Sequence, residues 1–221
     1  MTATALASWH RRFPGQLAGS VYAADPESRV DAAQTLSAAG LDVHVDVMAE
    51  AEGLPAGVSL AELNRIADTV DSARIGVHLI GSPDFVDTIL QSVLAVRPAV
   101  VFLPWTAFTA ERTAAVRAAG SQAWVAMWRE WDGLDESSAP VWPSKPDGVL
   151  VMLIEPGTKD RCALSRLAVV TACAGDLPVA VDGGVTESVA ELCVTAGASS
   201  IVVGRALLAV AAATMNEETD E

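Results

Sequence analysis

The sequence predicts an α/β protein, a (β/α)8 barrel of the TIM type, and three observations favour this fold class. Short runs rich in Val, Ala and Leu alternate with longer amphipathic segments along the chain. Eight such strand–helix units fit into 221 residues at roughly 28 residues each, the proportion of a compact barrel. The units are even in length without a long crossover in the middle, which favours the barrel over a doubly wound sheet. We therefore expect one domain over residues 1–221.

Each element follows from its apolar pattern and from the residues that bound it. The expected strands are the apolar runs at residues 15–23, 42–48, 74–80, 99–104, 122–128, 148–154, 178–184 and 200–204. The expected helices are the amphipathic segments 26–40, 82–96, 109–120, 162–175 and 186–197, several of which end in Gly, a common helix C-cap. Ser82 before Pro83 and Thr186 before Glu187 are typical N-caps. Two units are weaker, because residues 49–70 hold a loop before their helix and residues 129–146 are mostly loop.

The charge balance excludes two classes of partner. The chain has 28 acidic against 14 basic residues and a formal net charge of −14, which argues against a nucleic-acid or anionic-membrane surface. Residues 214–221 form an acidic tail that we expect to be disordered. The apolar runs are too interrupted for a membrane span, and the start "MTATALASWHRRFPG" has its Arg pair after the apolar stretch, unlike a signal peptide. We expect a cytoplasmic protein.

Polar side chains interrupt the apolar strands near their carboxyl ends, where a barrel carries out its chemistry. In "VHVDVM" (43–48), alternation places His44, Asp46 and Met48 on one strand face and the three valines on the other. A single His–Asp pair is equally well explained as a hydrogen-bonded pair of the core. His78 and Asp182 end two further strands, however, and four such groups at one mouth suit a divalent metal. We therefore predict one divalent ion (Zn, Mn, Fe or Co) held by His44, Asp46, His78 and Asp182.

These residues carry a resemblance to a known family, the ribulose-phosphate 3-epimerases (pentulose-5-phosphate 3-epimerases). "SVYAADP" resembles the family's Ser-x-x-x-Ala-Asp segment at the first strand, "VHVDVM" its His-x-Asp-x-Met strand and "VHLI" its His-Leu-Met. "GVLVMLIEPG" is similar to its sixth strand and "VDGGV" to its seventh, with "GASSIVVGRAL" after it. The resemblance runs in register from Gly19 to Leu208 and implies the ribulose-phosphate-binding type of barrel.

The resemblance implies a metal-dependent isomerase that inverts C3 of a ketose phosphate, converting D-ribulose 5-phosphate to D-xylulose 5-phosphate or a close relative. The metal would bind the C2 carbonyl and C3 hydroxyl oxygens and stabilise the enediolate. Asp46 and Asp182, on opposite faces of the substrate, would act as base and acid, with metal polarisation compensating for the weak basicity of a carboxylate. Ser20 would hydrogen-bond near the metal or the substrate. Met48 and Met152 would form an apolar floor.

The chain departs from the family where the substrate phosphate binds. The family's Gly-Phe-Gly-Gly-Gln run after strand six, whose backbone N–H groups cradle the phosphate, is replaced by "PGTKDRC", and Gly-Ser after strand eight by Gly204-Arg205. We predict that the phosphate lies between Gly183–Gly184 and Gly204–Arg205, with Arg205 or Lys159 supplying positive charge. The alternative for Arg205 is a surface residue that points away from the mouth.

Further departures surround the mouth. The family's third-strand Met is Ile80 here, its fourth-strand His corresponds to Pro104, and its Asn-Pro-Gly-Thr turn after strand five is replaced by "WREW". Trp105, Trp128 and Trp131 follow strands four and five, so that they either narrow the mouth, pack at the rim or form an oligomer contact. We expect a homo-oligomer with a small-molecule sugar phosphate as its ligand.

Other interpretations stay open at this point. One alternative is a metal-dependent sugar-phosphate decarboxylase on a related barrel. Such an enzyme would carry an Asp-x-Lys motif at the end of the second strand, and "VDVMAE" has no Lys there. The remaining alternatives are an epimerase-like barrel with an altered substrate and a non-catalytic barrel that binds a sugar phosphate or a partner protein. The two opposed carboxylates favour an enzyme, since a pure binder has no need of them.

Overall fold

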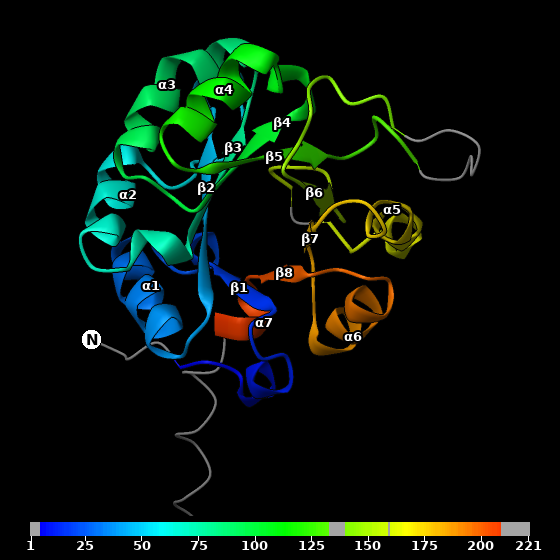
Figure 1. The fold of residues 1–221 in the computed structure, drawn as a ribbon. Helices are drawn as coiled ribbons and strands as arrows, with labels where there is room; N and C mark the ends of the chain where they lie inside the picture. Colours follow the sequence, from blue (N-terminus) through cyan, green and yellow to red (C-terminus); the bar gives the residue numbers. More distant parts are fainter. Residues whose placement is uncertain (1–4, 133–139, 159, 209–221) are drawn as a thin grey trace, which may run out of the picture.

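Eight parallel strands form a closed barrel in the order β1 to β8 in the computed structural model, which describes residues 5–132, 140–158 and 160–208 (Figure 1). The strands are β1 (Leu17–Ser20), β2 (Asp42–Met48), β3 (Ile75–Ile80), β4 (Val100–Pro104), β5 (Gln122–Met127), β6 (Gly148–Met152), β7 (Val179–Asp182) and β8 (Ser200–Val203). Each strand pairs with its sequence neighbours, and β1 closes the barrel by pairing with β8. The predicted (β/α)8 barrel is confirmed.

Helices surround the strands (Figure 1). They are α1 (Arg29–Ala38), α2 (Leu60–Ala67), α3 (Pro83–Ala95), α4 (Ala110–Ala118), α5 (Leu167–Cys173), α6 (Glu187–Thr195) and α7 (Arg205–Leu208). Ser82 and Thr186 cap α3 and α6 as predicted, because their side-chain oxygens accept hydrogen bonds from Phe85 N and Val189 N. The described residues between β5 and β6 contain no helix, in agreement with the loop expected over 129–146.

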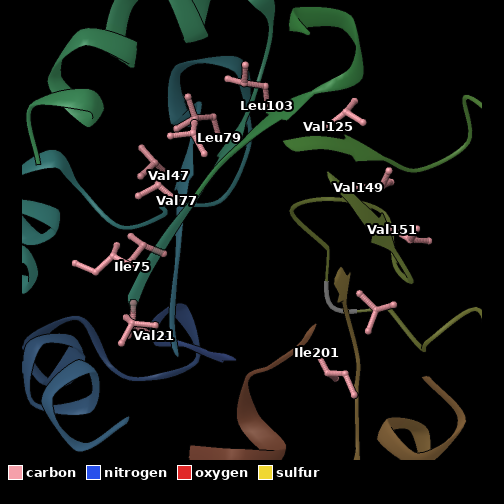
Figure 2. Packing of buried hydrophobic residues seen from close by; sticks show 14 of the residues in the cluster. Val21, Val47, Ile75, Val77, Leu79, Leu103, Val125, Val149, Val151 and Ile201 are labelled. Carbon is pink, nitrogen blue, oxygen red and sulfur yellow. The ribbon is translucent and has the colours of Figure 1, made fainter. Parts of the chain in front are cut away.

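Alternation along the strands separates two cores. Val43, Val45 and Val47 belong to the larger core, together with helix residues such as Leu36, because their side chains leave the barrel on its outer side. Figure 2 shows Val47 and other residues of this core on the strand faces turned toward the helices. A smaller core fills the barrel interior with Ala18, Phe102, Trp124, Ala126, Leu150, Met152, Ala180 and Val202. His44, Asp46 and Met48 therefore occupy the inward face of β2.

Gly148 marks a tight point of the inner core. A Cβ atom at this position would overlap the indole ring of Trp124, so Gly148→Ala is expected to lower the free energy of unfolding by about 1–3 kcal/mol. Gly175→Ala is the matched control, because a Cβ there meets no atom within 4 Å. Urea denaturation of both variants checks this prediction, and equal stability of the two would contradict it.

Two sequence-based expectations concern the membrane and the acidic tail. Among the helices that the structure describes, none combines the length and the apolar character needed to cross a bilayer. The tail expected at residues 214–221 lies outside the described residues, and so does Lys159.

Candidate active site

The register of the sheet brings the chemistry-bearing residues to one end of the barrel. Asp46 on β2 pairs with His78 on β3, and Met152 on β6 pairs with Asp182 on β7. His44 precedes Asp46 by two residues on β2 and therefore projects on the same inward face. Asp46, His78, Met152 and Asp182 lie in the carboxyl-terminal halves of their strands, which is the end where (β/α)8 enzymes carry their active sites. His44 lies earlier in β2 but is level with Ser20, the last residue of β1.

Four side chains meet at a single point of this mouth. One potential ligand atom from each of His44, Asp46, His78 and Asp182 lies within 4.8 Å of those of the other three. His44 Nε2 lies 3.1 Å and His78 Nδ1 3.3 Å from Asp46 Oδ1. The same two nitrogens lie 3.7 Å and 3.8 Å from Asp182 Oδ2. Two carboxylates thus face one pair of imidazole nitrogens.

The donor set fits a divalent metal ion. Two imidazole nitrogens and two carboxylate oxygens are ligands that Zn²⁺ and other first-row divalent ions take up in proteins. His44 and His78 are each only 1% exposed, and the Phe102 ring packs against both imidazoles with centroid distances of 5.4 Å and 6.2 Å. Because the ring restricts how either histidine can turn, their nitrogens are held toward Asp46 and Asp182.

The two carboxyl groups differ in proton affinity. Burial opposes ionisation of Asp46, but the neighbouring His44 and His78 outweigh it and lower the pKa of the Asp46 carboxyl. Burial raises the pKa of Asp182 to about 6, and the nearby charge of Asp46 contributes to this rise. Burial also works against protonated His44, yet the Asp46 carboxylate raises the pKa of its imidazole. The two carboxyl groups therefore differ in pKa although they lie in the same cluster.

Ser20 supports Asp46 from the neighbouring strand. Its hydroxyl donates a hydrogen bond of 2.9 Å to Asp46 Oδ2, the oxygen that the histidines do not contact. The sequence predicted a hydrogen bond from Ser20 near the metal or the substrate, and in the structure its partner is this carboxylate. Ser20 thereby fixes the orientation of the Asp46 carboxyl group.

A cavity of about 560 Å³ opens over these residues. Asp46 and Asp182 line it, and so do all the residues predicted to bind substrate, namely Ser20, Met48, Met152, Gly183, Gly184, Gly204 and Arg205. The two turns that carry the glycines lie after adjacent strands, β7 and β8. The cavity therefore joins the His–Asp cluster to the place predicted for the substrate phosphate.

The turn after β7 requires glycine. Gly183 and Gly184 have φ values of +115° and +66°, in the region that side chains disfavour. A Cβ atom on Gly183 would lie 2.8 Å from the backbone N of Ile154, and one on Gly184 would lie 3.1 Å from the backbone N of Cys162. With no side chain at either position, the bare backbone forms the cavity wall beside Asp182.

Arg29 is a cavity residue that the sequence pattern did not single out. It is 5% exposed, its Nη1 donates to the Gly57 carbonyl at 2.9 Å, and it pairs with Glu62 at 3.1 Å. The guanidinium also lies 5.5 Å from the centroid of the Tyr22 ring. Arg29 occupies the start of a predicted amphipathic helix, where an arginine is usually solvated. Its burial depends on partners that are distant in the sequence.

The fold and the cluster together define a class of protein, a (β/α)8 barrel with a two-histidine, two-aspartate centre at the carboxyl ends of its strands. The sequence model described as the ribulose-phosphate 3 epimerase family matches residues 16–208, which is most of the chain. The chain belongs to this family, and the resemblance found in the sequence is confirmed. A search of curated proteins finds no match.

Solved structures support the fold. Phosphoribosyl anthranilate isomerase from Thermus thermophilus is similar with a TM-score of 0.60 and 14% identity, over 86% of this chain and 88% of that chain. A mutant tryptophan synthase α-subunit from Pyrococcus furiosus is similar with a TM-score of 0.63 and 19% identity, over 87% of this chain and 88% of that chain. At these identities the similarity establishes the barrel and says nothing of the reaction.

Proposed function

We propose that the protein is a metal-dependent epimerase that inverts C3 of a ketose phosphate, with D-ribulose 5-phosphate and D-xylulose 5-phosphate, or a close relative, as the interconverted pair. The observation that carries the proposal is the placement of Asp46 and Asp182. They face the same two imidazole nitrogens from β2 and β7, strands that β8 and β1 separate in the barrel. Family membership supports the same reaction class.

Two carboxyl groups on opposite sides of a carbon can invert its configuration. In one direction, the first carboxylate removes the C3 proton and leaves the electron pair delocalised toward the C2 carbonyl as an enediolate. The second carboxyl group, which is protonated, then delivers its proton to the opposite face of C3. The reverse reaction uses the same two groups with exchanged roles, so that protons and charge balance in both directions.

His44, His78, Asp46 and Asp182 would hold one divalent ion, Zn, Mn, Fe or Co. When bound, such an ion supplies Lewis-acid stabilisation of the negative charge that develops on the substrate oxygens. Ser20 and the two histidines keep Asp46 at a fixed orientation, while Met48 and Met152 give the cavity apolar walls against the sugar carbons.

Metal analysis coupled to solvent-deuterium exchange tests the proposal. The purified protein is assayed for bound metal, loaded with Zn, Mn, Fe or Co, and incubated in deuterated buffer with a panel of ketose phosphates. The proposal predicts about one metal ion per chain and chelator-sensitive deuterium incorporation at C3. A non-catalytic sugar-phosphate binder would bind members of the panel without any exchange, whether or not a chelator is added.

Arg205 is the residue that we propose to place a positive charge beside the anionic end of the substrate. Loss of this charge in Arg205→Ala is expected to raise KM for the best phosphorylated substrate by about 10- to 100-fold, with a smaller effect on kcat. Arg65→Ala on the exposed face of α2 is the matched control. An unchanged KM in Arg205→Ala would show that Arg205 does not bind the substrate phosphate.

A further inference from the structure

A second, smaller cavity opens beside the active site, where β3, β4 and β5 end. Its volume is about 160 Å³, and its walls include Ile80, Pro104, Trp105, Ala126, Trp128 and Met152. Ile80 and Met152 also line the larger cavity, and His78 of the His–Asp cluster lines the smaller one. The two cavities therefore adjoin at the candidate metal centre.

The small cavity exists because short side chains stand between bulky ones. Pro104 and Ala126 are register partners on β4 and β5, and neither extends far into the mouth. Ala126 belongs to the inner core together with Met152, so its methyl group faces the barrel interior. A larger side chain at position 126 would fill this space.

Arg166 and Arg129 pack against Trp128, one of the two tryptophans that line the cavity. The Arg166 guanidinium lies 5.7 Å from the centroid of the Trp128 ring, and that of Arg129 lies 5.2 Å from it. Arg166 is 8% exposed, and its Nη1 donates a 2.8 Å hydrogen bond to the Trp131 carbonyl. These contacts hold residues 128–131 in place, as is usual for a preformed small-molecule pocket.

The charge on its wall disfavours an anionic group in this cavity. Its described lining contains no lysine or arginine, and it contains Glu130, whose carboxylate accepts a 2.6 Å hydrogen bond from the Trp128 backbone N. Gly183, Gly184, Gly204 and Arg205 lie in the larger cavity, after β7 and β8. Since β4 and β8 are on opposite sides of an eight-stranded barrel, a substrate with its phosphate beside β8 directs its other end toward the small cavity.

We infer that the small cavity is a specificity pocket for an apolar substituent on the carbonyl side of the reacting carbons. An apolar cavity of about 150 Å³ accommodates one benzene molecule, and the walls here are mostly apolar apart from His78, Thr106 and Glu130, so the substituent has about the size of a six-membered ring. Among the close relatives of the pentulose phosphates that the proposed function allows, the pocket then favours one that carries this apolar group where a pentulose phosphate has its terminal hydroxymethyl group. This inference rests on the proposed function, because the metal centre and the phosphate decide which end of the substrate reaches the cavity.

Two hydroxamates that differ only at this end test the inference. Glycolohydroxamate and benzohydroxamate chelate a divalent ion through the same two oxygens and carry a hydroxymethyl or a phenyl group on the carbonyl carbon. Calorimetric titration into the metal-loaded protein is expected to show benzohydroxamate binding at least about tenfold more tightly, because the phenyl group leaves water for apolar walls. Equal affinities, or tighter binding of glycolohydroxamate, would overturn the inference.

Ala126→Leu fills the pocket and is expected to remove this preference while leaving the affinity for glycolohydroxamate unchanged. Ala114→Leu on the exposed face of α4 is the matched control and keeps the preference. A preference retained in Ala126→Leu would assign the phenyl group to another surface and overturn the inference.

Benzyl alcohol probes the pocket without the metal. Saturation-transfer NMR of the metal-free protein is expected to show its binding to the parent and to Ala114→Leu, and no binding to Ala126→Leu. Equal signals in parent and Ala126→Leu would count against the pocket. If neither hydroxamate binds the metal-loaded protein, the proposed metal centre is contradicted, and the benzyl alcohol result alone then decides whether the pocket takes an apolar group.

Discussion

Metal-replete Asp182→Asn is expected to lose net epimerisation by about 10²- to 10⁴-fold while still exchanging the C3 proton of one epimer with solvent. In this variant Asp46 can remove a proton from the face it reaches and return a solvent-derived deuteron to the same face. Asp46→Asn is expected to show the converse, with exchange only from the other epimer. Deuterium incorporation into each separate epimer, followed by NMR, distinguishes the two half-reactions.

Both aspartates are also proposed metal ligands, so bound metal is measured in each variant before its rate is interpreted. Asp42→Asn is the matched control, because Asp42 begins the same strand as Asp46 but is exposed and lies away from the His–Asp cluster. If either metal-replete variant epimerised at close to the parent rate, that aspartate would be neither the acid nor the base.

His44→Ala and His78→Ala are each expected to lower metal affinity at least about tenfold, and epimerisation with it. Each removes one of two imidazoles that face both carboxylates, which leaves Asp46 and Asp182 with one nitrogen donor. His10→Ala is the control, since His10 hydrogen-bonds to the Ala7 carbonyl in the N-terminal turn and is not a member of the cluster. Elemental analysis after dialysis measures the effect, with circular dichroism to verify the fold.

Full metal occupancy in both histidine variants would contradict the assigned ligand set. Loss of metal in only one of them would reduce the set to three protein ligands, which is the arrangement in many catalytic zinc sites.

The strand pattern carried enough information to predict both the barrel and the meeting of the polar residues. In residues 42–48, strict alternation assigns the valines to the outer core and His44 and Asp46 to the interior, and a closed parallel barrel then brings every such strand end to one mouth. The ends of elements were predicted less well. The run at 15–23 leaves the sheet after Ser20 for a 3-10 turn, and the helix expected at 162–175 begins only at Leu167.

Features that depend on packing between distant segments could not be predicted from the sequence. Arg29 and Arg166 resemble surface residues of amphipathic segments, and their burial is explained by tertiary partners such as Glu62 and the Trp131 carbonyl. The small cavity is likewise a volume left unfilled where β3, β4 and β5 end, and it cannot be inferred from Ala126 until the neighbouring side chains are placed. Unfilled space depends on three-dimensional packing, which periodicity does not encode.

In the proposed function, Asp46 and Asp182 transfer the C3 proton of a ketose phosphate at a metal centre. The decisive test of this proton transfer is a deuterium-exchange experiment. The metal-loaded protein is incubated in deuterated buffer with each epimer of pentulose 5-phosphate, and with related ketose phosphates. We expect at least one substrate to gain a solvent deuteron at C3 with inversion, and a chelator to abolish this exchange. Full metal occupancy without C3 exchange in any substrate of the panel would contradict it.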